Sequence, residues 1–499
     1  MSAMQELNGL PRIPSAWRWS TIRNACLKVQ DGTHFSPQNQ LAQGAYRYIT
    51  AKNVRPFGLD LSNVSYLAED EHRAIYKRCD PKKGDVLLVK DGVNTGDAAV
   101  NTLDEEFSLL SSVCLLRPRP ELLFSQFLRY YLLSPVGYRM LTGQMTGTAI
   151  KRIILGRIKE SPVPIAPLDE QRTIVAEIEK QFSRLDEAVA NLKRVKANLK
   201  RYKASVLKAA VEGKLTEDWR KQHPDVEPAS KLLERILAER RAKWDGRGKY
   251  KEPDTLDASG LPLLPNSWEW VSLDQLLLNI TDGDHQPPPQ TNSGVPFLVI
   301  GNVRSGKLKF EGSRFVSRQY ADGVDGFRKP TRGDILYTLV GSFGIALRVD
   351  SDQEFCIQRH IGVFRPHKLS PTAYLVHALN SLFIFLQATK VATGTAQKTV
   401  PLVGLRRFAI PLAPQAEQQQ IVTEVERRLS IIEELETSVE ANLTRADRLR
   451  QSILSQAFSG RLLGRDTKHI PDILPTFSIA AEGQARYGKD SRAPLCQYE

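Results

Sequence analysis

Two pairs of an acid and a histidine are the first candidates for chemistry in this chain. Asp31 precedes His34 in an Asp-Gly-Thr-His segment, and Asp282 precedes His285 in an Asp-Gly-Asp-His segment. An aspartate in such a segment is typical of a turn, where its oxygens accept backbone N–H groups. Contact of each pair with a ligand is the second interpretation, and the sequence leaves both open. No recurring Ser or Cys accompanies the pairs as a nucleophile with a partner.

One segment has the spacing of a phosphate-binding loop, from Gly301 to Gly306-Lys307. Leu308 follows, so the hydroxyl that would hold Mg²⁺ is missing. An adenine methyltransferase would need an Asn/Asp-Pro-Pro-aromatic tetrapeptide, and the proline run at residues 287–289 does not fit it. We therefore predict no catalytic residue and no metal ligand. A single-chain DNA methyltransferase or nuclease with unrecognised motifs is kept as an alternative.

The two acid–histidine segments belong to an internal duplication. Five segments of the first half return in the same order about 250 residues later, a spacing far too long for a solenoid repeat. The chain therefore contains two similar domains, which suits a target with two parts. The matched segments are Ile13–Trp19 with Leu264–Trp270, Asp31–His34 with Asp282–His285, Lys83–Leu87 with Arg332–Leu336, Thr146–Ala149 with Thr393–Ala396, and Pro167–Ile174 with Pro414–Ile421.

The composition is that of a globular, moderately basic protein. The 499 residues include 69 Lys and Arg against 56 Asp and Glu, which gives a formal net charge of +13. An excess of this size suits a polyanion partner but does not require one. Five cysteines without a Cys-x-x-Cys pair fit a reducing compartment. No signal core and no run of 18 apolar residues is found, so we expect a cytoplasmic protein.

Each half begins with a region of short β-type segments and turn signals, at about residues 12–166 and 263–413. A helical stretch follows in each region, over residues 122–133 and 372–386. These patterns predict an α+β domain in each half. The predicted strands cover residues 46–50, 85–89 and 112–116 in the first half, and residues 297–300, 334–337 and 361–364 in the second.

A long helix is predicted after each domain. Residues 168–212 contain no Pro or Gly, and apolar residues recur every three or four positions from Ile174 to Val206. The copy runs from Ile421 to Ile453, and Gly213 and Gly460 are placed to end the two helices. A helix of about 45 residues spans roughly 68 Å, and a seam of that length needs a partner. We expect the helices to form an antiparallel coiled coil; packing of each helix on its own domain is the alternative.

Six motif pairs in a common order resemble the specificity (S) subunit of type I restriction–modification enzymes. Pro167-Leu168-Asp169-Glu170-Gln171 and Pro414-Gln415-Ala416-Glu417-Gln418 open the two helices, after proline-containing segments at residues 162–165 and 408–412. The Trp-x-Trp, Gly-Asp-Val/Ile-Leu and Thr-Gly-Thr segments also look like the family. The second helix lacks the Leu after its Pro, which is a small departure.

The resemblance implies two pseudo-symmetric target-recognition domains of an α/β kind, separated by two conserved long helices. In such a subunit, each domain reads one half of a bipartite DNA site and the coiled coil sets the spacer, without catalysis in this chain. The expected layout is residues 1–167 for the first recognition domain, 168–213 for the first helix, 214–261 for a linker with a short docking helix, 262–414 for the second recognition domain, 415–460 for the second helix and 461–499 for a C-terminal tail.

The resemblance also implies partners and cofactors. Two modification (methyltransferase) subunits carrying S-adenosylmethionine would dock on this chain, and restriction (endonuclease/translocase) subunits using ATP and Mg²⁺ would join them. The chain itself would need no cofactor and would work in a bacterial or archaeal cytoplasm. A coiled-coil scaffold that binds no DNA is the other alternative.

Candidate DNA contacts follow from comparing the halves. Half-sites on one face of a duplex lie about 34–36 Å apart, within reach of the long helices. Base-reading residues should differ between the halves, whereas phosphate contacts should match. Lys151 and Lys398 match and are phosphate candidates, while the matched Asn53 and Asn302 suit turns. The unmatched candidates for base reading are Lys52, Lys90, Asn94 and Arg152 in the first half, and Arg304, Ser342, Arg359 and His360 in the second.

The residues expected to form the coiled coil or to dock subunits lie at the start of each long helix. They are Glu170, Gln171, Ile174, Ile178, Phe182 and Leu185 in the first helix, and Glu417, Gln418, Ile421, Val425, Leu429 and Ile432 in the second.

Overall fold

The computed structural model describes residues 10–35, 37, 40–143, 152–244, 249–285 and 288–463. The chain divides into two compact units: unit 1 comprises residues 1–188 and 445–499, and unit 2 comprises residues 189–444. Each unit contains one α+β domain, the first part of one long helix and the last part of the other. The first Thr-Gly-Thr segment and Lys151 lie outside the described residues.

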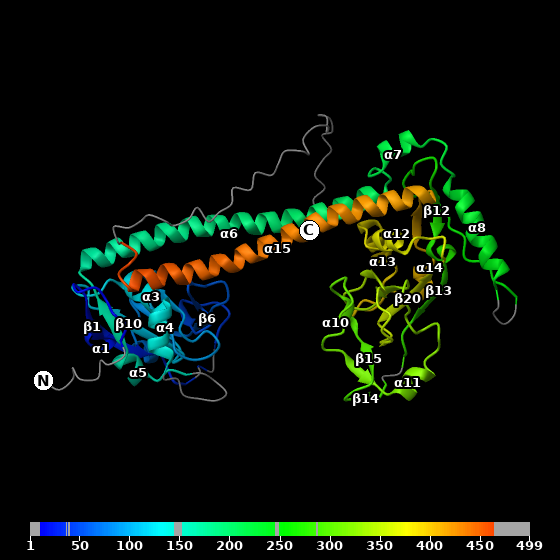
Figure 1. Ribbon diagram of the computed structural model, residues 1–499. Coiled ribbons are helices and arrows are strands. Elements are labelled where there is room, and N and C mark those ends of the chain that lie inside the picture. Colours follow the sequence, from blue (N-terminus) through cyan, green and yellow to red (C-terminus); the bar gives the residue numbers. More distant parts are fainter. Residues whose placement is uncertain are drawn as a thin grey trace. The chain divides into compact units, whose positions relative to one another are not determined.

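The centre of unit 1 is a four-stranded antiparallel sheet in the order β2-β10-β7-β8 (Figure 1). A three-stranded sheet, β6-β3-β9, and the short pairs β1-β11 and β4-β5 complete the β-structure. The strands are β1 (Arg18–Thr21), β2 (Cys26–Asp31), β3 (Tyr46–Ile49), β4 (Val54–Arg55), β5 (Gly58–Leu59), β6 (Ser65–Leu67), β7 (Val86–Val89), β8 (Ala98–Val100), β9 (Phe107–Leu109), β10 (Val113–Pro118) and β11 (Pro162–Ile165).

Side chains of the central sheet alternate between two cores, because successive strand residues point to opposite faces. Leu87 and Leu115 pack with Phe107 and Leu109 of the three-stranded sheet. Val86, Leu88 and Leu116 pack in a second core with helical residues of α3 and with both long helices. The helices of this domain are α1 (Ile22–Ala25), α2 (Glu69–Tyr76), α3 (Ser125–Leu133), α4 (Pro135–Thr142) and α5 (Leu155–Glu160).

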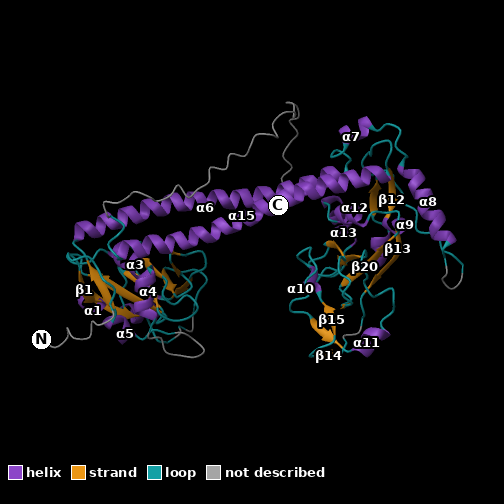
Figure 2. Cartoon of the chain, in the orientation of Figure 1, coloured by secondary structure: helices purple, strands orange, loops and turns teal. Residues whose placement is uncertain are grey.

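Unit 2 repeats this plan, as the helices and strands of Figure 2 show. Its central sheet has the order β13-β20-β17-β18, and a second sheet has the order β14-β16-β15-β19. The strands are β12 (Glu269–Ser272), β13 (Leu277–Asp282), β14 (Gln290–Thr291), β15 (Val295–Leu298), β16 (Arg314–Val316), β17 (Ile335–Thr338), β18 (Ala346–Arg348), β19 (Cys356–Ile357), β20 (Ile361–Pro366) and β21 (Ala409–Leu412). The helices are α9 (Leu273–Leu276), α10 (Ile300–Val303), α11 (Arg318–Gly323), α12 (Thr372–Leu379), α13 (Leu382–Val391) and α14 (Leu402–Arg406).

The single helix predicted over residues 372–386 is wrong, because α12 ends before α13 begins. Ser381 caps the second helix, with its side chain accepting the Ile384 N–H at 3.4 Å. Ser134 caps α4 in the same way through the Gly137 N–H at 3.0 Å. A serine that takes a backbone donor in this manner favours a new helix start over continuation of the old one.

The two long helices are α6 (Leu168–Val211) and α15 (Gln415–Phe458), each of 44 residues. In unit 2 the end of α6 packs with the start of α15, so the helices run antiparallel there. Lys196 Nζ lies 2.7 Å from Glu440 Oε2. In unit 1 the start of α6 packs with the end of α15. The predicted fold class, with its antiparallel helix pair, is confirmed. The apolar seam of unit 2 consists of Leu192, Leu199, Leu429, Ile432, Leu435, Val439 and Leu443.

Packing of each long helix on its own domain, kept above as an alternative, also occurs. Ile174 and Ile178 are buried in the core of the recognition domain of unit 1, and Ile421 and Val425 in that of unit 2. Leu429 contacts both this core and the seam, while Ile432 belongs to the seam. Phe182 packs edge-on against Tyr130 of α3, with ring centroids 5.8 Å apart. The first turns of each helix are therefore part of a domain core.

Between α6 and β12 the chain forms two helices, α7 (Glu217–Gln222) and α8 (Ala229–Ala242). The sequence predicted one docking helix in this segment. Leu232 and Ile236 of α8 are buried in the main core of unit 2. Within the described ranges, no helix combines the length and the apolar character needed to cross a membrane.

Candidate nucleic-acid interface

In unit 1, several turns meet at one end of the central sheet, where β2 and β7 end and β10 begins. The Lys90 N–H donates to Ser112 O at 2.9 Å, and the Ile153 N–H donates to Lys90 O at 2.9 Å. The Ala51 N–H donates to Ser112 Oγ at 3.3 Å. The structure therefore brings four predicted base-reading candidates onto neighbouring turns: Lys52, Lys90, Asn94 and Arg152.

Two carboxylates organise the cations at this end of unit 1. Asp31 lies 3.6 Å from Lys90 Nζ and 3.2 Å from Arg78 Nη2. Asp91 lies 3.4 Å from Lys90 Nζ, and it accepts from Arg152 Nε at 2.6 Å. The hydrogen bond and the charge of Asp91 raise the pKa of the Arg152 guanidinium. A continuous chain of opposite charges therefore links Asp31, Lys90, Asp91 and Arg152.

The four candidates differ in their access to a ligand. Lys90 is only 4% exposed and lies between the two carboxylates. Lys52 and Arg152 are exposed, and Asn94 is half-buried beside the fully exposed Val93. Lys90 is thus buried and placed to hold Asp31 and Asp91 by ion pairs. The other three side chains are accessible to a partner in the free protein. That any of them reads a base stays a prediction.

The acid–histidine pairs have the same geometry in both units. His34 Nε2 lies 3.2 Å from Asp31, and His285 Nε2 lies 3.0 Å from Asp282. Each aspartate is also near an arginine: Arg78 in unit 1, and Arg328 in unit 2 at 3.3 Å. The carboxylates therefore belong to small ionic clusters, while the histidines are largely exposed.

The corresponding turns of unit 2 are joined by equivalent backbone bonds. The Leu339 N–H donates to His360 O at 2.9 Å, and the Gly341 N–H donates to Lys398 O at 3.0 Å. Ser342, Arg359, His360 and Lys398 therefore lie on adjoining turns. Arg359 and Lys398 are exposed. Burial and the neighbouring Arg359 lower the pKa of His360, so its imidazole is neutral at pH 7.

The side chains at equivalent positions of the two units differ. The Ile153 N–H donates to Lys90 O at 2.9 Å in unit 1. The Val400 N–H donates to Leu339 O at 2.9 Å in unit 2. The bridge between Asp91 and Arg152 has its counterpart between Val340 and Thr399. One backbone scaffold thus carries a charged network in unit 1 and apolar or neutral side chains in unit 2.

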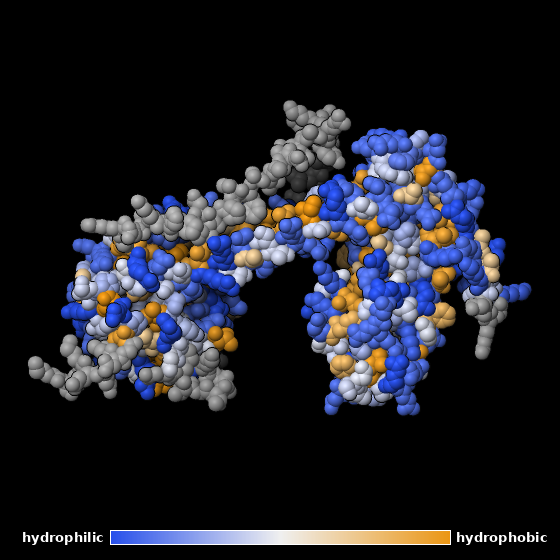
Figure 3. Space-filling model, in the orientation of Figure 1, coloured by the Kyte–Doolittle hydropathy of each residue, from blue (hydrophilic) through white to orange (hydrophobic). Residues whose placement is uncertain are grey.

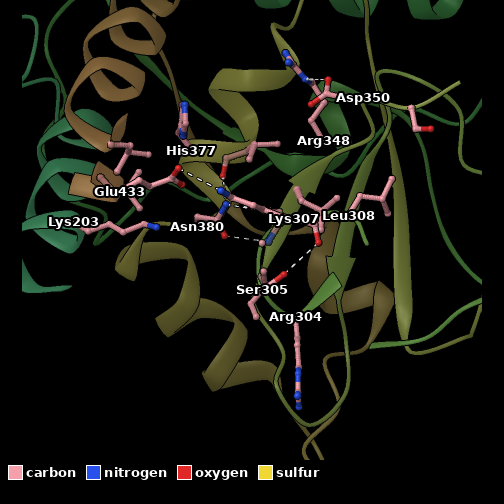
Figure 4. A pocket seen from close by; sticks show the side chains of 18 of the residues that line it. Lys203, Arg304, Ser305, Lys307, Leu308, Arg348, Asp350, His377, Asn380 and Glu433 are labelled. Carbon is pink, nitrogen blue, oxygen red and sulfur yellow. Dashed lines mark hydrogen bonds and ion pairs between the residues drawn. The ribbon is translucent and has the colours of Figure 1, made fainter. Parts of the chain in front are cut away.

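Arg304 lies apart from the other candidates of unit 2. It borders a recess of about 1060 Å³ between the recognition domain and the helix pair of that unit (Figure 4). Lys307 Nζ lies 3.3 Å from Glu433 Oε2 of α15 at this recess. The segment from Gly301 to Lys307 is a short helix followed by a turn with Gly306 at φ +75°. The described residues contain no group of three His, Cys, Asp or Glu that could hold a metal.

The repeated Gly-Asp-Val/Ile-Leu motif has a structural role. Gly84 and Gly333 have φ values of +89° and +94°, which glycine adopts most readily. Asp85 then receives Arg117 Nε at 2.9 Å. Asp334 receives Arg365 Nε at 3.1 Å in the same way. Asn53 and Asn302 likewise bond to backbone groups of their own turns, as predicted.

At the helix starts, Gln171, Glu417 and Gln418 are buried and form contacts within their units, whereas Glu170 is half-buried. Gln171 donates to Leu122 O at 2.9 Å and accepts the Phe124 N–H at 2.8 Å. Gln418 donates to Ala413 O at 2.7 Å. Glu417 accepts from Thr216 Oγ1 at 2.6 Å, from Arg220 and from Trp268 Nε1 at 2.8 Å. The repetition of the Trp-x-Trp and Glu-Gln segments in the sequence pointed to a role for these residues. It did not indicate that Trp268 and Glu417 form a hydrogen bond.

The fold defines a class of protein in which two recognition domains of one plan share a pair of long helices. The family model "Type I restriction modification DNA specificity domain" matches residues 15–201 and 266–445. The specificity subunit of type I restriction enzyme EcoKI from Escherichia coli K12 is 24% identical over 490 residues, covering 94% of each chain. The EcoBI specificity subunit of Escherichia coli is 24% identical over 340 residues, 67% of this chain and 66% of that one.

A solved structure has a similar fold. It is described as "Structural basis underlying complex assembly and conformational transition of the type I R-M system", and it matches with a TM-score of 0.60 and 19% identity, over 91% of this chain and 100% of that one. The chain belongs to the type I restriction–modification DNA specificity family and carries two copies of its domain. It is a specificity subunit, a non-catalytic component of such a complex.

Proposed function

We propose that this chain reads a bipartite site on duplex DNA, with one half-site for the recognition domain of each unit. The observation that carries the proposal is the contrast at equivalent positions. The same backbone bonds support Lys90, Asp91 and Arg152 in unit 1 and Leu339, Val340 and Thr399 in unit 2. A common scaffold with different side chains is what two readers of different sequences require, since base contacts carry the specificity.

The paired helices are the spacer in this proposal. The antiparallel contacts within each unit, such as the one between Lys196 and Glu440, support a stiff connection. A 44-residue helix extends roughly 66 Å, which exceeds the 34–36 Å or so between half-sites on one face of the duplex.

The partners would supply the chemistry. Two modification subunits with S-adenosylmethionine would dock on the helices and domains, and restriction subunits with ATP and Mg²⁺ would join them. The support is membership of the specificity family together with relatives named as subunits of type I restriction enzymes. We place the complex in the cytoplasm of a bacterium or archaeon, where its DNA target would be met.

The test is a domain exchange in the full chain. Residues 12–166 are replaced by the recognition domain of another specificity subunit, and the methylated site is mapped for the complex with its modification subunits. One half-site should change, and the other half-site and the gap should persist. A change in both half-sites would contradict the assignment of one domain to each half-site.

Two further measurements separate the alternatives. Binding of the complex to duplex DNA should weaken steeply with salt, because each neutralised phosphate releases counterions. Absence of DNA binding would favour a protein scaffold. Methylation or cleavage of DNA by the isolated chain, with S-adenosylmethionine, ATP and Mg²⁺ present, would favour a single-chain enzyme.

A further inference from the structure

Arg152 of unit 1 is hydrogen-bonded through its Nε, while most of its side chain is exposed. Its Nε donates to Asp91 Oδ1 at 2.6 Å, yet 61% of its side chain is exposed. The backbones of the two residues are paired in an antiparallel bridge. In the part of the chain that the structure describes, no acceptor binds either Nη atom of Arg152. Among the described residues, the guanidinium is therefore bonded through Nε alone.

Asp91 is itself held in place. Its side chain is 12% exposed and lies 3.4 Å from the buried Lys90 Nζ, which Asp31 contacts from the other side. An ion pair with one exposed partner, such as Arg152 with Asp91, contributes little to stability. The main physical effect of this network is therefore to restrict the orientation of Arg152, which costs conformational entropy before any ligand binds.

The open edge of Arg152 matches one base. Two adjacent N–H donors fit the O6 and N7 acceptors of guanine in the major groove, and no other base offers this pair of acceptors there. We propose that Asp91 is a positioning residue that aims Arg152 at a guanine in the half-site read by unit 1. This inference rests on the proposed function and deepens it by naming a base and the device that selects it.

Unit 2 does not share the device. Val340 and Thr399 occupy the positions of Asp91 and Arg152, and Leu339 occupies that of Lys90. None of these three side chains carries a charge. Loss of Asp91 or Arg152 should therefore affect one half-site and leave the other unchanged.

The test uses the full chain assembled with its modification subunits, after the split site has been mapped by methylation. Affinity is measured for duplexes in which each base pair of both half-sites is replaced in turn. Arg152→Ala should lower the preference for guanine at one pair of the first half-site by about tenfold to a hundredfold. Asp91→Asn should lower it at the same pair by about threefold to tenfold, and Asp91→Glu should restore part of it.

A modified base gives a readout that a purely structural role would not change. With 7-deazaguanine at that pair, the N7 acceptor is lost and O6 remains, so the wild-type complex should bind more weakly than it binds the unmodified pair. The Arg152→Ala complex should show no further loss, because the two changes remove the same contact. Arg23→Ala is the control: Arg23 also pairs with a carboxylate, Glu160, at 2.9 Å, but it precedes β2 and so lies at the opposite end of that strand from Asp31.

Three results would overturn the inference. Arg152→Ala could leave every base preference intact, the affected pair could lack guanine, or Asp91→Asn could change no more than Arg23→Ala. In each case split-site reading by the wild-type complex would still support the proposed function. A wild-type complex without any base preference would overturn both.

Discussion

The indole Nε1 of Trp268 donates a 2.8 Å hydrogen bond to the buried carboxylate of Glu417 at the start of α15. Thr216 and Arg220, which follow the end of α6, donate to the same carboxylate. The matched residues of unit 1 are Trp17 and Glu170. Trp17 Nε1 is buried and has no hydrogen-bond partner among the described residues, and Glu170 is half-buried. The two copies of one motif therefore differ in polar contact.

This asymmetry predicts unequal effects of one substitution. Glu417→Ala removes the acceptor for Trp268, Thr216 and Arg220. We therefore expect the free energy of unfolding to fall by about 3–5 kcal/mol. The matched Glu170→Ala should cost no more than about 0.5 kcal/mol. Urea unfolding followed by tryptophan fluorescence compares the two variants with the wild type. A loss of no more than about 0.5 kcal/mol for Glu417→Ala would mean that the Glu417 cluster does not stabilise unit 2.

The helix pair should act as a ruler in DNA recognition. Four residues inserted after Lys196 in α6 and four after Glu440 in α15 lengthen both helices by roughly 6 Å. The unread gap should then grow by about 1–2 base pairs, at about 3.4 Å per pair, while both half-sites keep their sequences. Methylation mapping measures this directly. The same insertion after Asp257, in the exposed linker, is the control and should leave the gap as it was.

His377 should make unit 2 sensitive to acid. Burial, and then the charge of Arg348, lower the pKa of His377 to about 4. The unfolded chain takes up this proton near pH 6.5, whereas the folded chain does so only near pH 4, so stability falls as the pH drops from 6.5 to 4. At pH 5 this difference in pKa lowers the free energy of unfolding by about 2 kcal/mol relative to its value at neutral pH. Unfolding of the wild type and of His377→Leu at pH 7.5 and pH 5 isolates it.

Between pH 7.5 and pH 5, the free energy of unfolding of the wild type should fall by about 2 kcal/mol more than that of His377→Leu. His223→Gln, at the exposed end of α7, serves as the control and should follow the wild type at both pH values. A constant difference between wild type and His377→Leu across this range would show that His377 is not held neutral by burial.

The repeated Asp-Gly segments have a steric requirement. A Cβ on Gly283 would lie 2.3 Å from Ile357 O, which is a backbone atom and cannot move aside cheaply. Gly283→Ala should therefore destabilise unit 2 by about 1–3 kcal/mol. Gly301→Ala is the control, because nothing lies within 4 Å of its added Cβ, and it should stay within about 0.5 kcal/mol of the wild type. Thermal unfolding midpoints would distinguish the two.

The face of the molecule in Figure 3 is mainly hydrophilic in both units, with apolar residues in small groups. This pattern agrees with a globular protein of ordinary composition, in which scattered exposed apolar side chains need no special explanation. Composition therefore restricted the class of the protein but pointed to no site.

Much of the fold followed from local patterns in the sequence. The duplication implied one plan for both halves, and apolar residues at steps of three and four implied the long helices. These features depend on nearest neighbours and on repetition along the chain. The break between α12 and α13 was missed, because Ser381 acts there as a cap in a sequence that otherwise favours one helix.

The sequence by itself determined that two similar domains alternate with two long helices, and that residues differing between the halves are the ones to examine. Only the tertiary structure decided that Lys90 is buried between two carboxylates, that Asp91 holds Arg152, and that Glu417 meets Trp268. The physical reason is distance along the chain: these partners are separated by up to 149 residues. Their contact depends on how strands and helices pack, which no local pattern records.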